Sequence, residues 1–541
     1  MHKNFLIQIF TLLLFTSNAV AQRVNEKQID STLASVTGAT EPGFVAAIIK
    51  SNKLVYAKGF GLADIEKQIK IDVKTPFNIA SNSKQFTVAC IYLLEQQGKL
   101  KTSDKLSRYF KDLPKYADSI TIAHLIYHQS GLKDYSTLRA LRNIGDFKRE
   151  RNMYQLLAAQ KSLNFKPGEE TSYSNSGYFY LSLIVKQLSG MDLADFAKQN
   201  IFTPLKMTST SFSRNHRIPH KANGYVFKDN QYLINNATDT TIGQGNMYSN
   251  VPDLKKWLNE IKTHKHFGEA LWQKMFTPPQ PGAKYAGGLI IDVVKGRKRI
   301  SHGGDIDGYH SDMYSFPNDD LGMIILSNKD NISISGIHAK LIEAVYGKET
   351  PAVVNTKTEE KKTSTPSITF DTTSYIGTYR MSPGTVFDVS KTNKELSVYQ
   401  RWNGMSFKLL PKTQHLFYTD FDPNVTFEFK NISNDKAQEL ELFQEGKVTK
   451  ITRTEIDINL TEYTGQFYND ELETSYTFII KDGVLEFSSN KEPVQLTATD
   501  KDHFYSDWGD IIFSRDKEGS INGFSLNHTR VKNLHFTKTI L

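Results

Sequence analysis

The sequence predicts an α+β domain followed by an all-β region. In the first part, apolar runs typical of strands lie near both ends, at residues 46–49 and 323–326, and helical patterns such as residues 178–188 lie between them. Strands at both ends of a domain with helices between them favour a mostly antiparallel sheet with helices packed against it. In the last part, short β-rich runs alternate with turn signals such as Asn403-Gly404 and Asp482-Gly483.

The first residues have the pattern of a secretory signal peptide. Lys3 provides a positive start, residues 5–15 are mainly apolar, and Ala19-Val20-Ala21 is a small-residue cleavage site. The alternative is an uncleaved anchor, but the apolar run is short for a bilayer. We therefore expect residues 1–21 to be removed after Ala21, which makes the protein periplasmic or secreted with no membrane anchor.

The composition excludes several classes of partner. The chain of 541 residues is 39% hydrophobic and 23% charged, which is ordinary for globular proteins and enough for at least two packed domains. Its net charge of +8 is scattered rather than gathered into a basic stripe, so we expect no nucleic-acid partner. The single cysteine, Cys90, lies in an apolar helical run, and we expect a buried, unreactive thiol.

Changes in composition divide the rest of the chain. We expect one domain over residues 22–350 and a linker over residues 351–368, because the latter are polar, rich in Thr, Lys and Glu, and carry a proline near each end. Two β-barrel-like repeats are then expected over residues 369–456 and 457–541.

The repeats are indicated by a short internal match. Tyr375-Ile376-Gly377-Thr378-Tyr379 corresponds to Tyr463-Thr464-Gly465-Gln466-Phe467, 88 residues later, and each precedes a strand-like run. Two copies of a small antiparallel β unit fit this pattern, either as two barrels or as one larger barrel. Self-association of the protein through these C-terminal β repeats is a further expectation.

Ser81-Asn82-Ser83-Lys84 is the first of three segments suited to chemistry. The run that it opens is apolar on nearly all faces, which predicts a buried helix with Ser81 at its N-terminus and Lys84 on the same face. A serine hydroxyl needs an adjacent base, and a lysine can be that base when burial or a nearby positive charge lowers its pKa. The same spacing recurs at Ser130 and Lys133, where a glycine after the serine indicates a helix terminus instead.

The second segment is Tyr173-Ser174-Asn175, which follows a turn and precedes a helical run. A tyrosine and an asparagine two residues apart in a loop can both face one cleft, where the phenol can move a proton and the amide can hold a substrate carbonyl. The alternative is that Ser174 or Asn175 merely caps the next helix. A second copy of the motif, Tyr248-Ser249-Asn250, precedes a proline and is typical of a helix start.

The third segment is His302-Gly303-Gly304-Asp305, next to a strand-like run. Paired glycines let a substrate approach the edge of a strand closely, and a backbone N–H there can join the N–H of Ser81 in an oxyanion hole. The alternative is a glycine turn with an exposed histidine. We expect no metal site and no cofactor: His124 and His128 have the spacing of a helix face but lack a third ligand, and a packed helix face is the better interpretation.

Together and in this order, the three segments resemble those of the serine β-lactamase and penicillin-binding superfamily. The resemblance is greatest to its branch of class C β-lactamases, D-alanyl-D-alanine carboxypeptidases, D-aminopeptidases and esterases, and it extends over roughly residues 30–347. It implies a β-lactamase/transpeptidase-like fold for this region. The C-terminal repeats resemble the lipocalin-like β domains that follow some of these hydrolases.

The resemblance also implies roles for the residues of the three segments. Ser81 would be acylated, and Lys84 and Tyr173 would share the proton transfers. Asn175 would hold the substrate amide, and the backbone N–H groups of Ser81 and Asp305 would form the oxyanion hole. His302 would stand, ahead of the substrate-binding glycines, where many β-lactamases carry the lysine of Lys-Thr-Gly.

These roles predict an exported serine hydrolase that forms an acyl-enzyme with a small peptide, amide or ester. A histidine in place of that lysine resembles some carboxypeptidases and aminopeptidases more than true β-lactamases, so we place β-lactam hydrolysis second. A third hypothesis, from another class, is a non-catalytic envelope-binding protein that kept the cleft. The substrate itself cannot be predicted from the sequence, because one fold of this kind serves many substrates.

Overall fold

The computed structural model describes residues 25–142, 150–347, 372–382, 384–392, 395–488 and 492–539. The expected signal peptide and the expected linker over residues 351–368 lie outside the described residues. In the part of the chain that is described, no helix has both the length and the apolar character needed to cross a bilayer.

A six-stranded antiparallel sheet forms the centre of the first domain. Its strands lie in the order β10-β11-β12-β13-β1-β2, so the two ends of the domain meet where β1 pairs with β13. The strands of this sheet are β1 (Phe44–Lys50), β2 (Lys53–Phe60), β10 (Ile290–Val294), β11 (Arg297–Ile306), β12 (Tyr309–Phe316) and β13 (Leu321–Ser327). Shorter strands flank it, in pairs or threes: β3 (Leu62–Asp64) with β4 (Ile69–Lys70), β5 (Phe77–Asn78) with β9 (Met247–Ser249) and β6 (Ser211–Phe212), and β7 (Tyr225–Lys228) with β8 (Gln231–Ile234).

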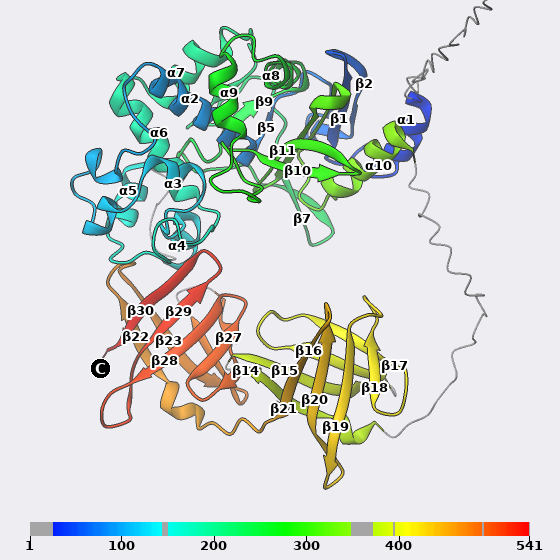
Figure 1. The fold of residues 1–541 in the computed structure, drawn as a ribbon, viewed down its shortest axis with the longest axis vertical. Coiled ribbons are helices and arrows are strands. Elements are labelled where there is room, and N and C mark those ends of the chain that lie inside the picture. The colour runs from blue at the N-terminus through cyan, green and yellow to red at the C-terminus, as the bar shows by residue number, and fades with distance from the viewer. Residues whose placement is uncertain are drawn as a thin grey trace, which may run out of the picture.

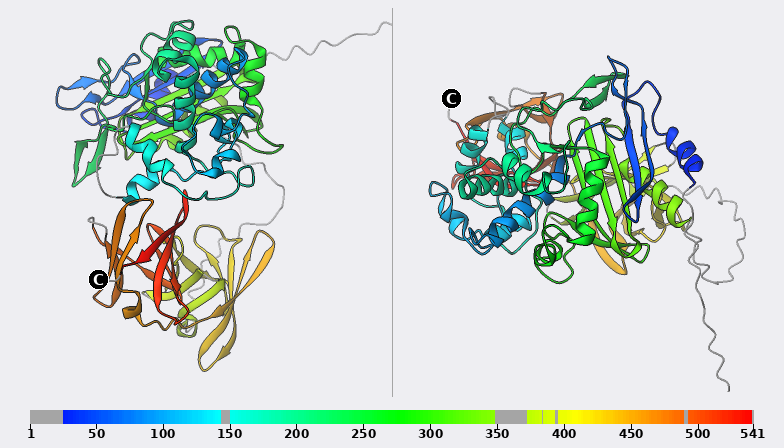
Figure 2. Two further views of the ribbon diagram at one scale, coloured as in Figure 1. Left: turned by 90° about the vertical axis from the view of Figure 1, so that its left-hand side faces the viewer. Right: turned by 90° about the horizontal axis from the view of Figure 1, so that it is seen from above.

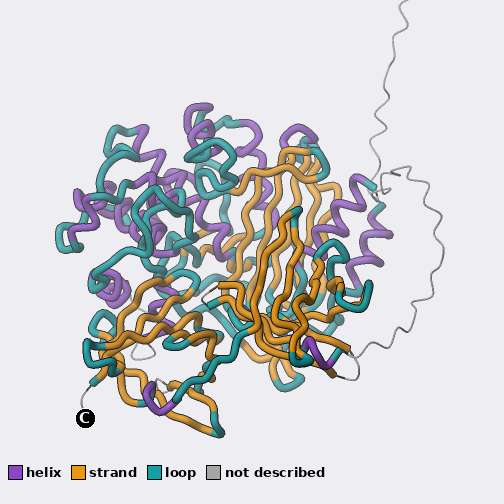
Figure 3. Tube along the Cα trace, turned by 60° about the horizontal axis from the view of Figure 1, so that its bottom comes forward, coloured by secondary structure: helices purple, strands orange, loops and turns teal. Residues whose placement is uncertain are grey.

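Helices cover both faces of this sheet, as Figure 3 shows. The helices are α1 (Glu26–Ala34), α2 (Lys84–Gln96), α3 (Ile122–Ile126), α4 (Tyr135–Arg142), α5 (Glu150–Ala158), α6 (Asn175–Ser189), α7 (Leu193–Ala197), α8 (Val251–Thr263), α9 (Glu269–Phe276) and α10 (Ile334–Tyr346). Successive residues of β1 alternate between the two faces: Ala46 belongs to an apolar cluster with residues of α1 and α10, whereas Ala47 belongs to another with residues of α2 and α8. Burial on both sides explains why this strand is an unbroken apolar run rather than an alternating one.

The first C-terminal repeat is a closed eight-stranded barrel of antiparallel strands. Its strands are β14 (Gly377–Ser382), β15 (Thr385–Thr392), β16 (Glu395–Gln400), β17 (Ser406–Pro411), β18 (Leu416–Thr419), β19 (Thr426–Ser433), β20 (Lys436–Gln444) and β21 (Lys447–Arg453). Aromatic side chains such as Tyr379, Phe387 and Phe429 pack together inside it, so its interior is a core.

The second C-terminal repeat is a nine-stranded sheet in the order β25-β24-β23-β22-β30-β29-β28-β27-β26. Consecutive strands β25 and β26 lie at its two ends, so the sheet curls into a nearly closed barrel, which we call the second β body. Its strands are β22 (Gly465–Asn469), β23 (Thr474–Lys481), β24 (Val484–Ser488), β25 (Val494–Gln495), β26 (Thr497–Asp500), β27 (His503–Ser506), β28 (Gly509–Arg515), β29 (Ile521–His528) and β30 (Val531–Lys538). The predicted α+β domain followed by all-β repeats is therefore confirmed, and the repeats form two separate barrels rather than one.

The second β body packs against the helices of the first domain, and the first barrel lies beside it (Figures 1 and 2). Buried residues of the second β body, such as Tyr476 and Phe536, belong to the same apolar cluster as the domain core. The hydroxyl of Tyr476 donates to the carbonyl of Leu141 in α4 at 2.7 Å. In this contact, the ammonium of Lys133 lies 3.2 Å from the carboxylate of Glu471, and both side chains are almost fully buried.

We predict that Glu471→Gln lowers the free energy of unfolding by about 3–5 kcal/mol, because it leaves the Lys133 ammonium buried without its counter-charge. Lys161→Met is the matched control. Its ammonium pairs with Asp470 at the same interface, but both side chains are about two-thirds exposed, so we expect a change below about 1 kcal/mol. The measurement is urea denaturation followed by tryptophan fluorescence.

A double variant separates charge from packing. Lys133→Met combined with Glu471→Leu removes both charges, so it should recover most of the stability lost in Glu471→Gln. An effect of Glu471→Gln no larger than that of Lys161→Met would show that the buried pair does not hold the interface.

Candidate active site

Ser81 lies in a short 3-10 turn, η1 (Ala80–Ser83), that leads directly into α2. The residue before it, Ala80, has a left-handed backbone with φ of +46°, a conformation that costs free energy for any residue with a Cβ. The Asn78 side chain accepts a hydrogen bond from the Ala80 N–H at 2.9 Å, and Ser311 of β12 donates to the carbonyl of Ile79 at 2.6 Å. The surrounding structure thus holds the serine in a strained, well-defined position.

Lys84 is the first residue of α2, and its ammonium nitrogen is enclosed by three oxygens. Nζ lies 3.1 Å from Ser81 Oγ, 2.9 Å from Asn175 Oδ1 and 2.7 Å from the carbonyl oxygen of Gln244. The side chain is fully buried. A neutral amine donates two hydrogens, to the Asn175 and Gln244 oxygens, and keeps its lone pair for the hydroxyl hydrogen of Ser81. This arrangement is suited to a general base.

Burial is the main reason that the pKa of Lys84 lies well below its ordinary value of 10.5. The negative charge of Asp134 raises the pKa, and the positive charge of Arg530 lowers it further. The neutral amine that general-base chemistry requires is therefore populated at lower pH than in an exposed lysine.

Tyr173 is the third group at this point. The Lys84 ammonium lies 4.6 Å from the centre of its ring, and the buried ring of His128 lies 4.3 Å from it on centroids. Burial raises the pKa of the Tyr173 phenol, and hydrogen bonding with Ser81 opposes that rise in part. The phenol stays protonated at neutral pH, so it can donate a hydrogen bond or a proton next to the serine oxygen.

Asn175 begins α6, and its backbone is held from another segment. Ser174 is the N-cap residue, but its side chain makes no capping hydrogen bond. The carboxylate of Asp134 accepts from the Asn175 N–H instead, at 2.6 Å. The capping alternative therefore does not explain Tyr173-Ser174-Asn175. At the second copy of the motif, Asn250 does cap α8, accepting from the Asp253 N–H, which confirms the predicted helix start.

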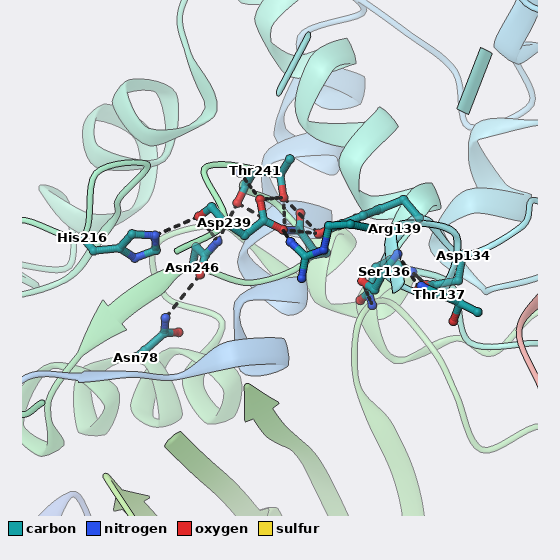
Figure 4. Close-up of polar contacts among 12 residues, drawn as sticks. Asn78, Asp134, Ser136, Thr137, Arg139, His216, Asp239, Thr241 and Asn246 are labelled. Carbon is teal, nitrogen blue, oxygen red and sulfur yellow. Dashed lines mark hydrogen bonds and ion pairs between the residues drawn. The ribbon is translucent and has the colours of Figure 1, made fainter. Parts of the chain in front are cut away.

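The Gln244 carbonyl, which accepts from Lys84, lies in a segment held by a network of polar contacts. Figure 4 shows the part of this network around Asp239. Asp239 accepts from the N–H and the hydroxyl of Thr241, both at 2.8 Å, and Asn246 donates to the carbonyls of Asp239 and Thr241. Asn78, which supports the turn at Ser81, donates to the Asn246 side chain at 3.3 Å. The segment from Asp239 to Asn246 contains Gln244, so this network fixes the Gln244 carbonyl against Lys84.

The strand β11 lines the other side of the site with an open edge. Its pairing with β10 ends where Ser301 faces Ile290, and among the described strands residues 302–306 pair only with β12. At Gly304 a Cβ atom would meet the Ile79 carbonyl oxygen at 2.3 Å and the Ser311 hydroxyl at 2.5 Å. Glycine is therefore required for the strand to lie directly against the turn that carries Ser81. Ser81 and Asp305 line the same pocket.

His302 is buried. The alternative of a glycine turn with an exposed histidine is therefore wrong. Its Nε2 lies 3.3 Å from the Tyr285 hydroxyl, and its Nδ1 contacts the carbonyl of Gly303. Burial lowers the pKa of His302 from 6.5 to about 4, and the nearby charge of Lys84 contributes in the same direction. At neutral pH this position therefore carries an uncharged ring.

These residues surround one pocket with a volume of about 490 Å³. Every candidate from the three segments either lines it or, like Lys84, lies directly behind it. The lining residues are Ser81, Tyr173, Asn175, Ile290, His302, Gly303, Gly304, Asp305, His310, Ser311, Asp312, Ile334, Ser335 and Arg530. The sequence did not reveal Arg530, which comes from the hairpin between β29 and β30, more than 350 residues after Tyr173.

One expectation about histidines changes. His124 lies in α3, but α3 ends at Ile126 and His128 follows it with a left-handed φ of +59°, so the predicted helix face shared by the two is wrong. The His128 ring instead packs against Tyr173. Within the described ranges, no group of three or more His, Cys, Asp or Glu side chains has a geometry suited to a metal ion.

The fold and the Ser-x-x-Lys segment at its centre define a class of protein, the serine β-lactamase and penicillin-binding superfamily of hydrolases. The family model described as Beta-lactamase matches residues 15–345, more than half of the chain, and the protein belongs to this family. The chain is 27% identical over 435 residues to "Penicillin-binding protein 4*" of Bacillus subtilis (strain 168), with 74% of this chain and 92% of that protein covered.

Two solved structures show the same fold. The octameric penicillin-binding protein homologue from Pyrococcus abyssi has a TM-score of 0.56 at 19% identity, covering 87% of this chain and 99% of its own. The D-amino acid amidase from Ochrobactrum anthropi SV3 has a TM-score of 0.50 at 21% identity, covering 59% and 98%. The first similarity extends into the C-terminal region, and the second is limited to about the length of the first domain.

We predict that Gly304→Ala lowers the free energy of unfolding by about 1–3 kcal/mol, because its Cβ has no space between β11 and the turn at Ser81. Gly303→Ala is the matched control. Its Cβ would meet no atom closer than 3.9 Å, so we expect a change within about 0.5 kcal/mol. Urea denaturation of the two variants tests this, and equal effects would mean that β11 does not press on the turn.

Proposed function

We propose that this protein is an exported hydrolase that cleaves a peptide, amide or ester through an acyl-enzyme on Ser81, with a substrate that contains a D-amino acid. The observation that supports this most directly is the contact between the buried Lys84 amine and the Ser81 hydroxyl, with the Tyr173 phenol beside both. A partly buried serine that follows a strained residue and contacts a base of lowered pKa is activated for nucleophilic attack.

The proposed reaction has two halves. Lys84 takes the proton from Ser81 as the serine oxygen attacks the substrate carbonyl, and the backbone N–H groups of Ser81 and Asp305 bind the developing oxyanion. Tyr173 donates its proton to the leaving group and is reprotonated by Lys84, so the leaving group departs with a proton, an ester stays on Ser81 and Lys84 is again a free base. Water then attacks this ester with the same groups acting as base, and the acid product is released with Ser81 regenerated.

The open edge of β11 supports a peptide or amide substrate. An extended chain can pair with residues 302–306 as an added strand, which holds its carbonyl at Ser81, while Asn175 binds a neighbouring amide. The protein from Ochrobactrum anthropi, which has the same fold, is named a D-amino acid amidase, and this supports a substrate with a D-amino acid here.

A β-lactamase is the second candidate, because the matching family model carries that name and the Bacillus subtilis relative is called penicillin-binding. The uncharged His302 ring, in the place where many β-lactamases have a lysine, favours the peptidase. The rate of release distinguishes the two: a β-lactamase frees the acyl group of nitrocefin rapidly, whereas a peptidase keeps a penicillin adduct for minutes or longer.

We also propose that residues 1–21 direct export and that the C-terminal β repeats mediate self-association. The name of the Bacillus subtilis relative supports the first, and the octameric state given for the Pyrococcus abyssi protein supports the second. The N-terminal sequence of the mature protein and light scattering of the purified chain test these two points.

We predict that Ser81→Ala abolishes covalent labelling by a fluorophosphonate and all turnover of D-aminoacyl anilides, D-alanyl dipeptides and chromogenic esters. Tyr173→Phe should lower kcat/KM by about 10²- to 10⁴-fold, because the proton donor is lost. Tyr248→Phe is the matched control from the second Tyr-Ser-Asn motif, and it should change kcat/KM by less than about threefold. Failure of the intact protein to label or to turn over any of these compounds would favour the non-catalytic binding protein.

We predict a pH dependence of Ser81 labelling by an uncharged fluorophosphonate. The rate should rise with pH as Lys84 loses its proton, with a midpoint well below 10.5. The charged or titratable groups that influence this lysine are Asp134, Arg530, His128, His302 and Tyr173. Because Arg530 lowers the pKa of Lys84, Arg530→Met should move the midpoint to higher pH.

Lys532→Met provides the control for this shift. It removes a positive charge from the same hairpin, but that charge is already paired with Glu170 at 3.2 Å, so the midpoint should stay where it is in the wild type. A midpoint that falls or does not move in Arg530→Met would contradict the assignment of the titrating group to Lys84.

A further inference from the structure

The hairpin between β29 and β30 brings a residue of the second β body into the candidate active site. The backbone carbonyl of Arg530 accepts two hydrogen bonds from the first domain, from the Asp134 N–H at 3.1 Å and from the Asn164 side chain at 3.0 Å. Two residues on, the N–H of Lys532 donates to the Asn164 side chain at 2.7 Å. The tip of the hairpin is thus fixed on both sides, so the Arg530 side chain leaves from a defined point.

The guanidinium of Arg530 faces the pocket. It lies 5.1 Å from the centre of the Tyr173 ring, and the residue is among those that line the cavity. In the described part of the chain, no carboxylate forms an ion pair with it, and no side-chain hydrogen bond satisfies its donors. A guanidinium presents its N–H groups in a rigid planar fork that matches a carboxylate.

The carboxylates around the cavity lie beside histidines, and neither pairs with Arg530. Asp305 lies 3.5 Å from His310, and Asp312 lies 3.0 Å from His338. His302 carries an uncharged ring at neutral pH. Arg530 is therefore the permanent cation of the described pocket lining, and it stands beside Tyr173, the group that serves the leaving group in the proposed reaction.

We propose that Arg530 binds a carboxylate on the leaving-group side of the substrate and so determines specificity for substrates with a free C-terminal carboxylate. This inference rests on the proposed function. In a peptide, only one nitrogen and one Cα separate the scissile carbonyl from the carboxylate of the next residue, which suits a cation beside Tyr173. The second β body thereby completes the specificity site, and the positive charge that the first domain lacks at His302 comes from the far end of the chain.

The test compares two peptides that differ in one group: acetyl-D-alanyl-D-alanine and its C-terminal amide. The full-length wild type should prefer the acid. Arg530→Met should lower the ratio of kcat/KM for the acid to that for the amide by about 10- to 100-fold, with partial recovery in Arg530→Lys. Because both peptides use the same Lys84, any change in its pKa cancels in this ratio. Lys532→Met, from the same hairpin, should leave the ratio within about threefold of wild type.

A binding measurement separates failure of this inference from failure of the proposed function. In Ser81→Ala, which needs no turnover, calorimetry should show tighter binding of the acid than of the amide, and adding Arg530→Met should remove the difference. An unchanged ratio in Arg530→Met, or equal binding of the two peptides to Ser81→Ala, overturns the role of Arg530. If wild type hydrolyses neither peptide but Ser81→Ala still prefers the acid, the anion site stands and the proposed reaction falls.

Discussion

The burial of the Lys84 amine is the constraint on which the rest of the site depends. An ammonium ion in the interior is costly unless it is neutralised or fully hydrogen-bonded. Here the amine is surrounded by oxygens of Ser81, Asn175 and Gln244, and each of these comes from a different part of the chain. The polar network around Asp239 serves to hold one of those oxygens in place, and the carboxylate of Asp134 holds the segment that provides another.

The position of the lysine also explains features that lower the stability of the site. The turn before α2 accepts a left-handed alanine at residue 80, and β11 requires a glycine at 304 so that it can lie against this turn. The strained turn at Ala80 and the close approach of β11 place the Ser81 hydroxyl, the Lys84 amine and the open edge of β11 around the same pocket. Such features persist when the surrounding structure determines them and are typical of functional sites.

Much of the fold and the local motifs could be predicted from the sequence. The apolar run of β1, the buried helix α2 and the helix start at Asn250 follow from patterns within a few residues. The sequence did not decide between two barrels and one larger barrel, because closure of a barrel depends on which distant strands pair. Gln244 could not be found, since it acts through its backbone carbonyl, which has no sequence signature. Arg530 was missed because it is a single arginine in an ordinary hairpin, and only the docking of the second β body places it beside Tyr173.

The second Ser-x-x-Lys pattern, at Ser130 and Lys133, contributes to this docking. Lys133 is not part of the pocket; it pairs with Glu471 beneath the first domain, and the next residue, Asp134, binds both the Arg530 carbonyl and the Asn175 N–H. One short segment of the first domain therefore links the second β body to the start of α6. The C-terminal region is structurally continuous with the site rather than an independent appendage.

The central claim is that burial in contact with Ser81, Asn175 and Gln244 holds the pKa of the Lys84 amine well below its ordinary value. Its most direct test is an NMR titration of the lysine 13Cε resonances in the full-length protein, with Lys84 assigned by its absence in Lys84→Arg. The account predicts a titration midpoint for Lys84 well below 10.5, while exposed lysines titrate near that value. A Lys84 resonance that titrates together with the exposed lysines would contradict it.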